Sequence, residues 1–535
     1  MRERSHHQPL FRDPYPLGRL KGKGIRLVLI LAALLCGAVV VRGFEPWNEP
    51  WSMVLGFGVW MRMVIASPPR RAVLLGFFFG LSHFALGFSW LLTSLIDHGG
   101  LYPLAGYGVL LVLAAVMSLY PMLYAWLLSR LIANRYWTLV IAGPLLWVGL
   151  EWVRAHFATG FPWNLVGYAW SWWLPVLQVA DLGGVYLLSW LTVFLAALST
   201  RFMFWGGKIW PLVIALSLGA VVFLSAYQYG EWRLDQNPVV EEGAEGITVG
   251  MVQGNISQAM KFDPQYRYEQ VDLYLRLTES TPNFDLMIWP ETALPYFVQR
   301  DRLAMNRIGS VAALRQTAIL TGAPTFTKRP SIDDERPEVD YYNSAMLFLP
   351  ESGGVLEYHK HHLVPFGEFL PFRGWIPDNW SKMTHGTKDF TRGPGPSVLD
   401  WEKGPLGPLV CYEVIFPDEV REVVAQGAKW LVNITNDGWF GATAKPQHLA
   451  MTRMRAVENR VPMIRVANTG ISAIYDAMGR QLQRINVDRM AVIGTFVPEN
   501  LVSPGPFFWI GTAWAWLMGL TSLVVLIFLR WRFRW

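Results

Sequence analysis

One short run specifies the architecture of the chain around it: Gly407-Pro408-Leu409-Val410-Cys411-Tyr412-Glu413-Val414-Ile415-Phe416-Pro417. Its apolar residues predict a strand that ends on Cys411. The following Phe416-Pro417-Asp418-Glu419 can open a helix, because proline and acidic residues are favoured in a first helical turn. A sulfur at a strand end near a helix N-terminus suits a nucleophile, since the helix end favours thiolate. The alternative is a buried structural cysteine, the commoner role of a free thiol.

Outward from this run, composition divides the chain into two kinds of sequence. Of 535 residues, 52% are hydrophobic and only 16% are charged, whereas a soluble protein carries about 25% charge. The apolar excess falls in 25–230 and 508–530, and the segment between them has ordinary globular composition. The chain is therefore predicted to be a membrane protein with a soluble domain large enough for its own core.

Cysteine usage and charge exclude several classes of protein. The chain has two cysteines, and Cys36 lies inside the first apolar run, so no disulfide framework is expected. No clustered Cys/His spacing predicts a structural zinc site. The net charge is +6, and the basic residues gather in short loops and at both ends. This distribution is typical of membrane topology rather than of nucleic-acid binding.

The apolar runs predict membrane spans. The run 27–41 follows a basic segment as a signal peptide would, but more runs and no convincing cleavage site follow it, so we expect a retained span. The others are 50–66, 72–95, 101–132, 137–155, 177–203, 208–227 and 508–530, each near the roughly 20 residues that cross a bilayer. The predicted divisions are a basic N-terminus 1–26, a transmembrane domain 27–230, a soluble domain 245–500, a final helix 505–530 and a basic tail 531–535. The positive-inside rule places both termini in the cytoplasm and the soluble domain in the periplasm.

The soluble segment alternates strands with helices, which indicates an α/β fold. Strands are predicted at 247–252, 285–289, 318–322, 343–349, 354–358, 431–435, 463–467 and 470–476, and helices at 266–280, 302–316 and 448–459. The segment 328–340 predicts a surface loop. The aromatic segment 156–175 predicts an interfacial aromatic belt, or else a platform that holds lipid beside a catalytic site.

Three of the predicted strands end in a reactive side chain, namely Glu291, Lys360 and Cys411. A thiol has a reference pKa of about 8.5 and is mostly protonated at neutral pH. A glutamate can take its proton, and a nearby lysine would favour thiolate and stabilise an oxyanion. The trio thus suits acyl transfer. Singly, Glu291 also fits a helix N-terminal charge, and Lys360 fits a solvated basic loop with His359, His361 and His362.

Longer motifs carry a resemblance to a known family. Three segments resemble the motifs of the nitrilase superfamily, whose catalytic triad is Glu-Lys-Cys. They are Trp289-Pro290-Glu291-Thr292-Ala293, Lys360 ahead of Leu363-Val364-Pro365-Phe366-Gly367-Glu368, and Cys411-Tyr412-Glu413. Together with Gln253-Gly254-Asn255 and Asn436-Asp437-Gly438-Trp439-Phe440, these variants resemble the apolipoprotein N-acyltransferase family. The resemblance implies a nitrilase-like αββα sandwich inserted in an eight-helix transmembrane domain of the cell inner membrane.

That family resemblance also implies a reaction. Cys411 would attack a phospholipid ester, commonly phosphatidylethanolamine, at sn-1, and the S-diacylglyceryl-cysteine amine of an apolipoprotein would then take the acyl chain. No metal, nucleotide or other cofactor is implied, and we expect a monomer. Glu291 would be the general base and Lys360 the transition-state stabiliser. The implied supporting residues are Glu368, Tyr412 and Glu413, and the implied substrate-contacting aromatics are Trp163, Trp439 and Phe262, where the family often has tryptophan.

Three other functions are open to this sequence. A membrane-tethered amidase or nitrile hydrolase could use the same triad, although a small soluble C–N substrate needs no eight spans. A scaffold with a degenerate domain would have no need to keep all three reactive residues. A transporter would need charges near the bilayer midplane, where Glu151 and Asp181 are the main acidic candidates.

Overall fold

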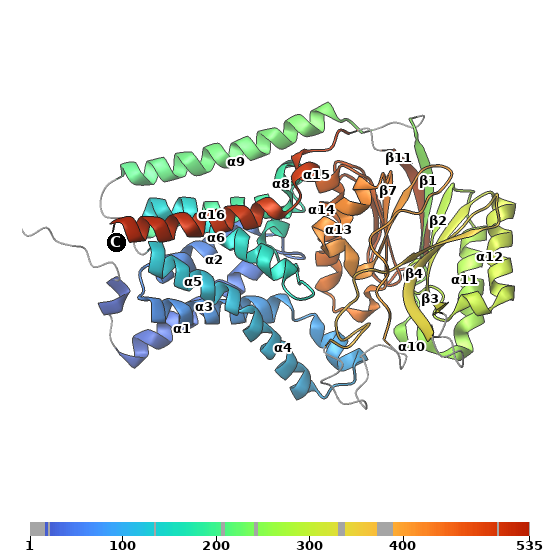
Figure 1. The fold of residues 1–535 in the computed structure, drawn as a ribbon, viewed down its shortest axis with the longest axis horizontal. Coiled ribbons are helices and arrows are strands. Elements are labelled where there is room, and N and C mark those ends of the chain that lie inside the picture. The colour runs from blue at the N-terminus through green and yellow to red at the C-terminus, as the bar shows by residue number, and fades with distance from the viewer. Residues whose placement is uncertain are drawn as a thin grey trace, which may run out of the picture.

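The protein consists of a helical half and a mixed α/β half, side by side along its long axis (Figure 1). The computed structural model describes residues 16–19, 22–132, 135–204, 209–239, 244–329, 338–371, 389–499 and 502–533. The predicted basic segments 1–26 and 531–535 and the predicted surface loop 328–340 lie partly outside these ranges.

The helical half is built from apolar helices. They are α1 (Lys23–Val41), α2 (Pro50–Ile65), α3 (Pro69–Gly87), α4 (Pro103–Met117), α5 (Leu119–Leu127), α6 (Tyr136–His156), α8 (Ala180–Ser199), α9 (Trp210–Gln236) and α16 (Ala513–Phe533). Among the described residues, six stretches are long and apolar enough to cross a membrane: 23–41, 103–132, 136–156, 180–202, 210–236 and 513–532. The predicted runs therefore form helices, with shifted ends.

Two of these differences from the predicted spans have local causes. The final run divides at Gly511, whose φ of 60° ends α15 (Pro506–Ile510) before α16 begins. The run 177–203 is interrupted at Gly183 and Gly184, which have non-helical backbone angles. The amide freed beyond this break, on Val185, donates to the carboxylate of Glu458 at 2.8 Å.

The α/β half contains two sheets. One has the strand order β11-β1-β2-β3-β4-β5 and the other β10-β9-β8-β7-β6. Their bounds are β1 Gly246–Gln253, β2 Leu286–Ile288, β3 Ala318–Arg329, β4 Glu338–Phe348, β5 Val355–His359, β6 Leu406–Val410, β7 Trp430–Thr435, β8 Met463–Ala467, β9 Ser472–Tyr475, β10 Gln481–Ile485 and β11 Ala491–Pro498. Strands β1, β2 and β3 run parallel, as do β6, β7 and β8.

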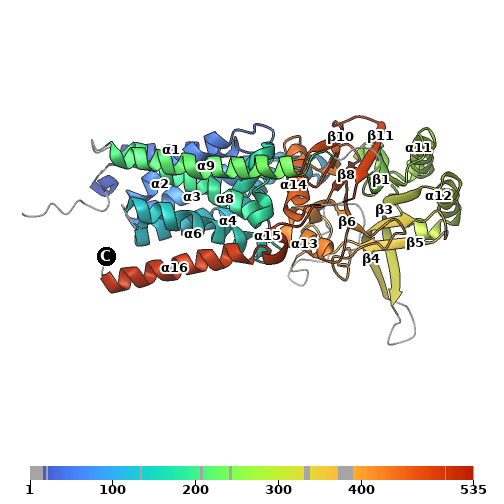
Figure 2. The ribbon, with the colours of Figure 1, turned by 90° about the horizontal axis from the view of Figure 1, so that it is seen from above.

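The two sheets share one apolar core, to which Val249 of β1 and Val432 of β7 both belong. Helices α11 (Arg267–Glu279) and α12 (Arg302–Arg315) pack on the outer face of the six-stranded sheet. Helices α13 (Pro417–Ala425) and α14 (Ala444–Asn459) lie on the five-stranded sheet, and their apolar side chains join the core of the helical half. Figure 2 shows α13 and α14 at the junction of the halves and α11 and α12 at the far end.

Much of the aromatic segment 156–175 packs at this junction, although Phe157 and Trp172 are exposed. Trp163, Tyr168 and Trp170 are buried, so the prediction of an interfacial aromatic belt is wrong for these rings. The Trp163 indole donates to Gln447 of α14 at 2.7 Å. The segment therefore forms part of the packing between the halves.

Charged side chains also cross the junction. Arg460, which follows α14, is fully buried and donates to Asp181 of α8 at 2.6 Å. The same guanidinium donates to Gln178 at 2.6 Å. Buried ion pairs hold their geometry when each charge is paired and hydrogen-bonded, so these contacts fix the halves to each other.

Candidate active site

The fold brings the three predicted reactive residues to one place. Glu291 follows β2, Lys360 follows β5 and Cys411 follows β6, and their exposed fractions are 6%, 1% and 5%. The Lys360 Nζ lies 3.9 Å from the Glu291 Oε1. The end of β7 contacts both of the other reactive residues. The hydroxyl of Thr435, the last residue of β7, lies 3.3 Å from the Cys411 Sγ, and the amide of the next residue, Asn436, donates to the Glu291 Oε2 at 2.7 Å.

Glu368, a predicted supporting residue, pairs directly with the lysine. Its Oε2 lies 2.9 Å from the Lys360 Nζ and its Oε1 lies 3.0 Å from the same atom. Asn343 was missed by the sequence reasoning, yet its Nδ2 donates to both Glu291 and Glu368 at 2.8 Å. The predicted hairpin contained the signal, because pairing of Ser344 with His359 sets Asn343 opposite Lys360.

The backbone of the nucleophile is held in a left-handed conformation, with a Cys411 φ of 53°. Such a conformation is unfavourable for a residue with a Cβ and persists only where the surroundings fix it. The Cys411 carbonyl accepts from the Asn433 Nδ2 at 3.2 Å and lies 3.2 Å from the His448 Nε2. Behind His448, Arg465 is paired with Asp437 at 2.6 Å. These polar groups are all buried.

The electrostatics of the trio call for a general base. Burial, followed by the Glu291 carboxylate, raises the pKa of the Cys411 thiol, and Lys360 only partly opposes this. Burial lowers the pKa of Lys360, but Glu368 and then Glu291 outweigh it and raise that pKa above its ordinary value. A 3-10 turn, Cys411–Ile415, separates the thiol from α13. The expected help from the N-terminus of that helix is therefore not supplied.

Glu413 organises the backbone around the nucleophile. Its Oε1 accepts from the Tyr358 hydroxyl at 2.8 Å and from the amides of His361 and His362 at 2.7 and 3.1 Å. Its Oε2 accepts from the Val410 amide at 2.7 Å. Burial, followed by Glu419, raises the pKa of Glu413 to about 7. This carboxyl joins the loop that carries Lys360 to the strand that carries Cys411.

The histidines around Lys360 are half-buried and have polar partners, and Lys360 itself is buried, so the alternative of a solvated basic loop does not hold for the lysine. The His359 Nδ1 lies 2.8 Å from the Ser344 hydroxyl. The His362 ring stacks on Phe416 at a centroid distance of 3.6 Å and lies 2.6 Å from the Glu419 carboxylate. Tyr412, also predicted as a supporting residue, is buried and packs edge-on against Phe416 at 5.1 Å.

The three predicted aromatic residues lie on the side that faces the helical half. Phe262 and Trp439 are neighbours, with ring centroids 5.8 Å apart. Trp439 also contacts His98, and its carbonyl accepts from the Ser94 hydroxyl at 2.6 Å. Trp163 is fully buried, with its ring 5.7 Å from that of His448. The site is thus bordered by the residues that join the halves.

A second lysine, Lys261, was not singled out from the sequence. It belongs to α10 (Gln258–Phe262), is fully buried, and donates to the main-chain carbonyl of Glu291 at 3.0 Å. The neighbouring Phe262 was predicted to be a substrate-contacting aromatic. A single lysine beside an aromatic residue, however, does not predict that the lysine is buried.

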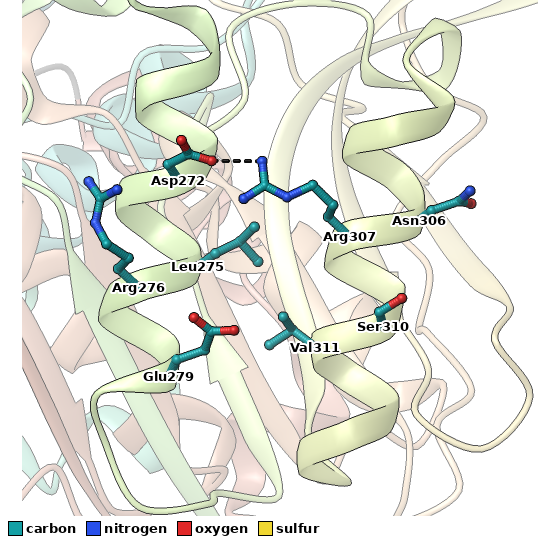
Figure 3. A pocket seen from close by; sticks show the side chains of 8 residues that line it. All are labelled: Asp272, Leu275, Arg276, Glu279, Asn306, Arg307, Ser310 and Val311. Carbon is teal, nitrogen blue, oxygen red and sulfur yellow. Dashed lines mark ion pairs between the residues drawn. The ribbon is translucent and has the colours of Figure 1, made fainter.

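The described surface also has a shallow hollow between α11 and α12, away from this site (Figure 3). Asp272 and Arg307 face each other across it at 2.7 Å. The residues that line it are Asp272, Leu275, Arg276, Glu279, Asn306, Arg307, Ser310 and Val311. This lining is a salt-bridged polar surface on the outer face of the six-stranded sheet, without a nucleophile–base pair.

Comparison with known proteins defines the class. Residues 248–497 match the carbon–nitrogen hydrolase family. An amidase from Nesterenkonia sp. of known structure is 22% identical, over 52% of this chain and 97% of that chain, with a TM-score of 0.36. Residues 248–497 are thus a carbon–nitrogen hydrolase domain, which is joined in this chain to apolar helices.

The apolar half identifies the family within that class. Residues 36–198 match the apolipoprotein N-acyltransferase N-terminal domain. The apolipoprotein N-acyltransferase of Geobacter metallireducens is 38% identical over 84% of this chain and 85% of that protein. That of Rickettsia prowazekii is 33% identical over 85% of this chain and 88% of that protein. The chain belongs to the apolipoprotein N-acyltransferase family.

Proposed function

We propose that the protein transfers a fatty acyl chain from the sn-1 position of a phospholipid to the N-terminal amine of the S-diacylglyceryl-cysteine of an apolipoprotein, the last step of lipoprotein maturation. The observation that carries this proposal is the buried Cys411, with Glu291 and Lys360 beside it, at the junction with apolar helices. A lipid donor and a lipid-modified acceptor both reach such a place from the bilayer.

The geometry supports a two-stage reaction through a thioester. Because its pKa is raised, the Cys411 thiol needs Glu291 to take its proton before it attacks the ester carbonyl. Lys360 stays protonated between its carboxylate neighbours and stabilises the oxyanion. Glu368 and Asn343 position the lysine and the base. Loss of lysophospholipid leaves the acyl group on the sulfur, and the acceptor amine then takes it.

The proposed architecture is a nitrilase-like αββα sandwich, 245–500, inserted in an eight-helix transmembrane domain. Supporting this, α9 and α16 run as separate helices along the helical half toward the α/β half (Figure 2). The C-terminus lies at the end of the helical half remote from the site (Figure 1). We propose cytoplasmic termini and a site facing the periplasm at the inner membrane. We also propose phosphatidylethanolamine as the donor and a monomeric enzyme.

The aromatic residues are proposed to guide the acyl chain. Phe262 and Trp439 border the site next to the helical half, where a lipid tail would approach. Trp163 is buried nearby and contacts Trp90 and Phe440. Aromatic rings supply apolar contact over a large area, which suits a chain without polar groups.

Intact mass of the purified protein tests the proposal. After incubation with phosphatidylethanolamine, the protein should gain one acyl group, and a diacylglyceryl-cysteine peptide should remove it. Cys411→Ser should gain no thioester, whereas the control Cys36→Ser should behave as wild type, because Cys36 lies in α1 of the helical half. No acyl gain with any phospholipid, together with turnover of small amides, would favour the tethered-amidase function instead.

A further inference from the structure

Lys261 has more hydrogen-bonding capacity than its surroundings use. Its side chain is fully buried, and a lysine ammonium carries three donors. Its Nζ donates to the Glu291 carbonyl at 3.0 Å, and within the described part of the chain it has no second acceptor. An unmatched buried donor is costly. Two N–H directions of this group are thus available to a ligand atom beside Glu291.

Gln258 is a second unmatched donor from the same helix. It precedes Lys261 by three residues, which places both on one face of α10. Its Oε1 accepts from the Asn436 Nδ2 at 3.1 Å, while its buried Nε2 has no partner among the described residues. The Asn436 amide in turn donates to the Glu291 carboxylate at 2.7 Å. Lys261 and Gln258 therefore both lie next to the general base.

Donors without acceptors suit an oxygen that gains negative charge during a reaction. In the proposed function, on which this inference rests, that atom is the sn-1 oxygen that leaves with the lysophospholipid. We propose that Lys261 is a second proton-transfer residue, which protonates this leaving oxygen and later accepts the proton of the attacking amine. The Gln258 Nε2 donates a hydrogen bond to the same oxygen.

The proton balance closes over the two stages. In the first, the Cys411 proton moves to Glu291, the sulfur–carbonyl bond forms, the carbonyl–oxygen bond breaks, and the Lys261 ammonium gives its proton to the departing oxygen. The site then holds a thioester, a protonated Glu291 and a neutral Lys261. In the second, the acceptor amine attacks the thioester and gives a proton to Lys261, while Glu291 returns its proton to the departing sulfur. Both residues end as they began.

The charge state of Lys261 agrees with this role. Burial lowers the pKa of Lys261 to about 7, against the opposing effects of Glu291 and Cys411, the ionisable groups whose charges act on it. An acid–base catalyst works best with a pKa near the operating pH. A lysine with the ordinary pKa of about 10.4 would be a weaker acid toward the leaving oxygen.

The test compares Lys261→Met, Lys261→Arg and a control, Lys429→Met, a surface lysine paired with Glu499. Single-turnover thioester formation is followed by intact mass with three donors of one fatty acid: phosphatidylethanolamine, diacylglycerol and a p-nitrophenyl ester. We expect a loss of about 100-fold or more in both Lys261 variants with the first two donors. With the p-nitrophenyl ester, whose leaving oxygen needs no acid, we expect wild-type rates.

The second stage gives an independent measurement. Acyl-enzyme prepared from the p-nitrophenyl ester should pass its acyl group to the diacylglyceryl-cysteine peptide about 100-fold more slowly in both variants. The wild-type rate with phosphatidylethanolamine should fall as pH rises above about 7, and Lys261→Arg should lack this fall, because arginine keeps its proton.

Four results would overturn the inference. Wild-type rates in Lys261→Arg would reduce the residue to a hydrogen-bond donor. A loss with phosphatidylethanolamine but not with diacylglycerol would assign it to binding of the phosphate. An equal loss with all three donors would mean that Lys261 only supports Glu291. Wild-type rates in Lys261→Met would exclude any role. Failure of the proposed function is distinct, since wild-type protein itself would then form no thioester with phospholipid.

Discussion

Replacing Glu368 by glutamine removes the carboxylate nearest to a buried ammonium. In the wild type both Glu368 oxygens lie within 3.0 Å of the Lys360 Nζ, and they also accept from Asn343 and from the Val364 amide at 2.8 Å. Glutamine keeps one acceptor and turns the other into a donor, which then faces the lysine or the amide. Glu291, at 3.9 Å, would then be the one carboxylate within ion-pair distance of Lys360 among the described residues.

Removing one partner of a buried ion pair costs about 3–5 kcal/mol. For a domain of this size each kcal/mol lowers Tm by roughly 2–4 °C, so Glu368→Gln should lower the Tm of the purified protein by about 10 °C. Because neighbouring carboxylates raise the pKa of Lys360, the stabilisation is complete below the ordinary lysine pKa of about 10.4. The difference in Tm should therefore stay constant between pH 7 and 9 and shrink only at higher pH.

The assay is thermal unfolding in detergent, paired with the rate of thioester formation. Glu357→Gln is the matched control, because Glu357 is an exposed residue of β5 whose carboxylate meets the Gln299 amide. We expect both stability and acylation to fall in Glu368→Gln and neither in the control. A variant that melts within about 2 °C of wild type and acylates normally would refute the role of Glu368 in holding the lysine.

Three further substitutions test other parts of the molecule. Glu291→Gln should leave the protein folded but abolish thioester formation, and accumulation at the normal rate would exclude Glu291 as the first base. Arg465→Met should cost about 3–5 kcal/mol by leaving Asp437 buried without its cation. Burial raises the pKa of Asp437, but Arg465 and His448 outweigh it and lower that pKa, so the deficit in unfolding free energy should shrink as pH falls below about 3.9. A pH-independent deficit would contradict this reasoning. Gly230→Leu should separate α9 from the rest of the helical half, because a Cβ at this position would lie 1.8 Å from the Pro175 carbonyl oxygen; unchanged protease sensitivity of α9 would count against it.

The elements that the sequence predicted well are those with strong local signals. The alternating strands after residue 246 and the α13 start at Pro417 were confirmed, since periodicity and a first-turn proline need no distant partner. The apolar runs were likewise confirmed as helices, but their ends were not, because Gly511 and Gly184 set them through backbone angles.

The parts of the site that were missed depend on partners far apart in the chain. Lys261 and Asn343 reach the site only because the fold places α10 and β4 beside Glu291, after the end of β2, where both side chains donate hydrogen bonds to it. The buried rings Trp163, Tyr168 and Trp170 were misinterpreted because they are apolar and close to predicted spans. Only the packing of α14 shows what covers Trp163. Burial is the main cause of the raised pKa of the Cys411 thiol. The spacing of residues in the sequence does not predict this burial.

The paired charges at the junction also bear on how the enzyme can be divided. Arg460 and Glu458 belong to the α/β half, yet their partners, Asp181 and the Val185 amide, belong to α8. A fragment cut at residue 245 would expose these charges together with the apolar surface of α14, and it would aggregate rather than act as a soluble hydrolase. The two halves therefore fold as one unit, because each half completes the interior of the other.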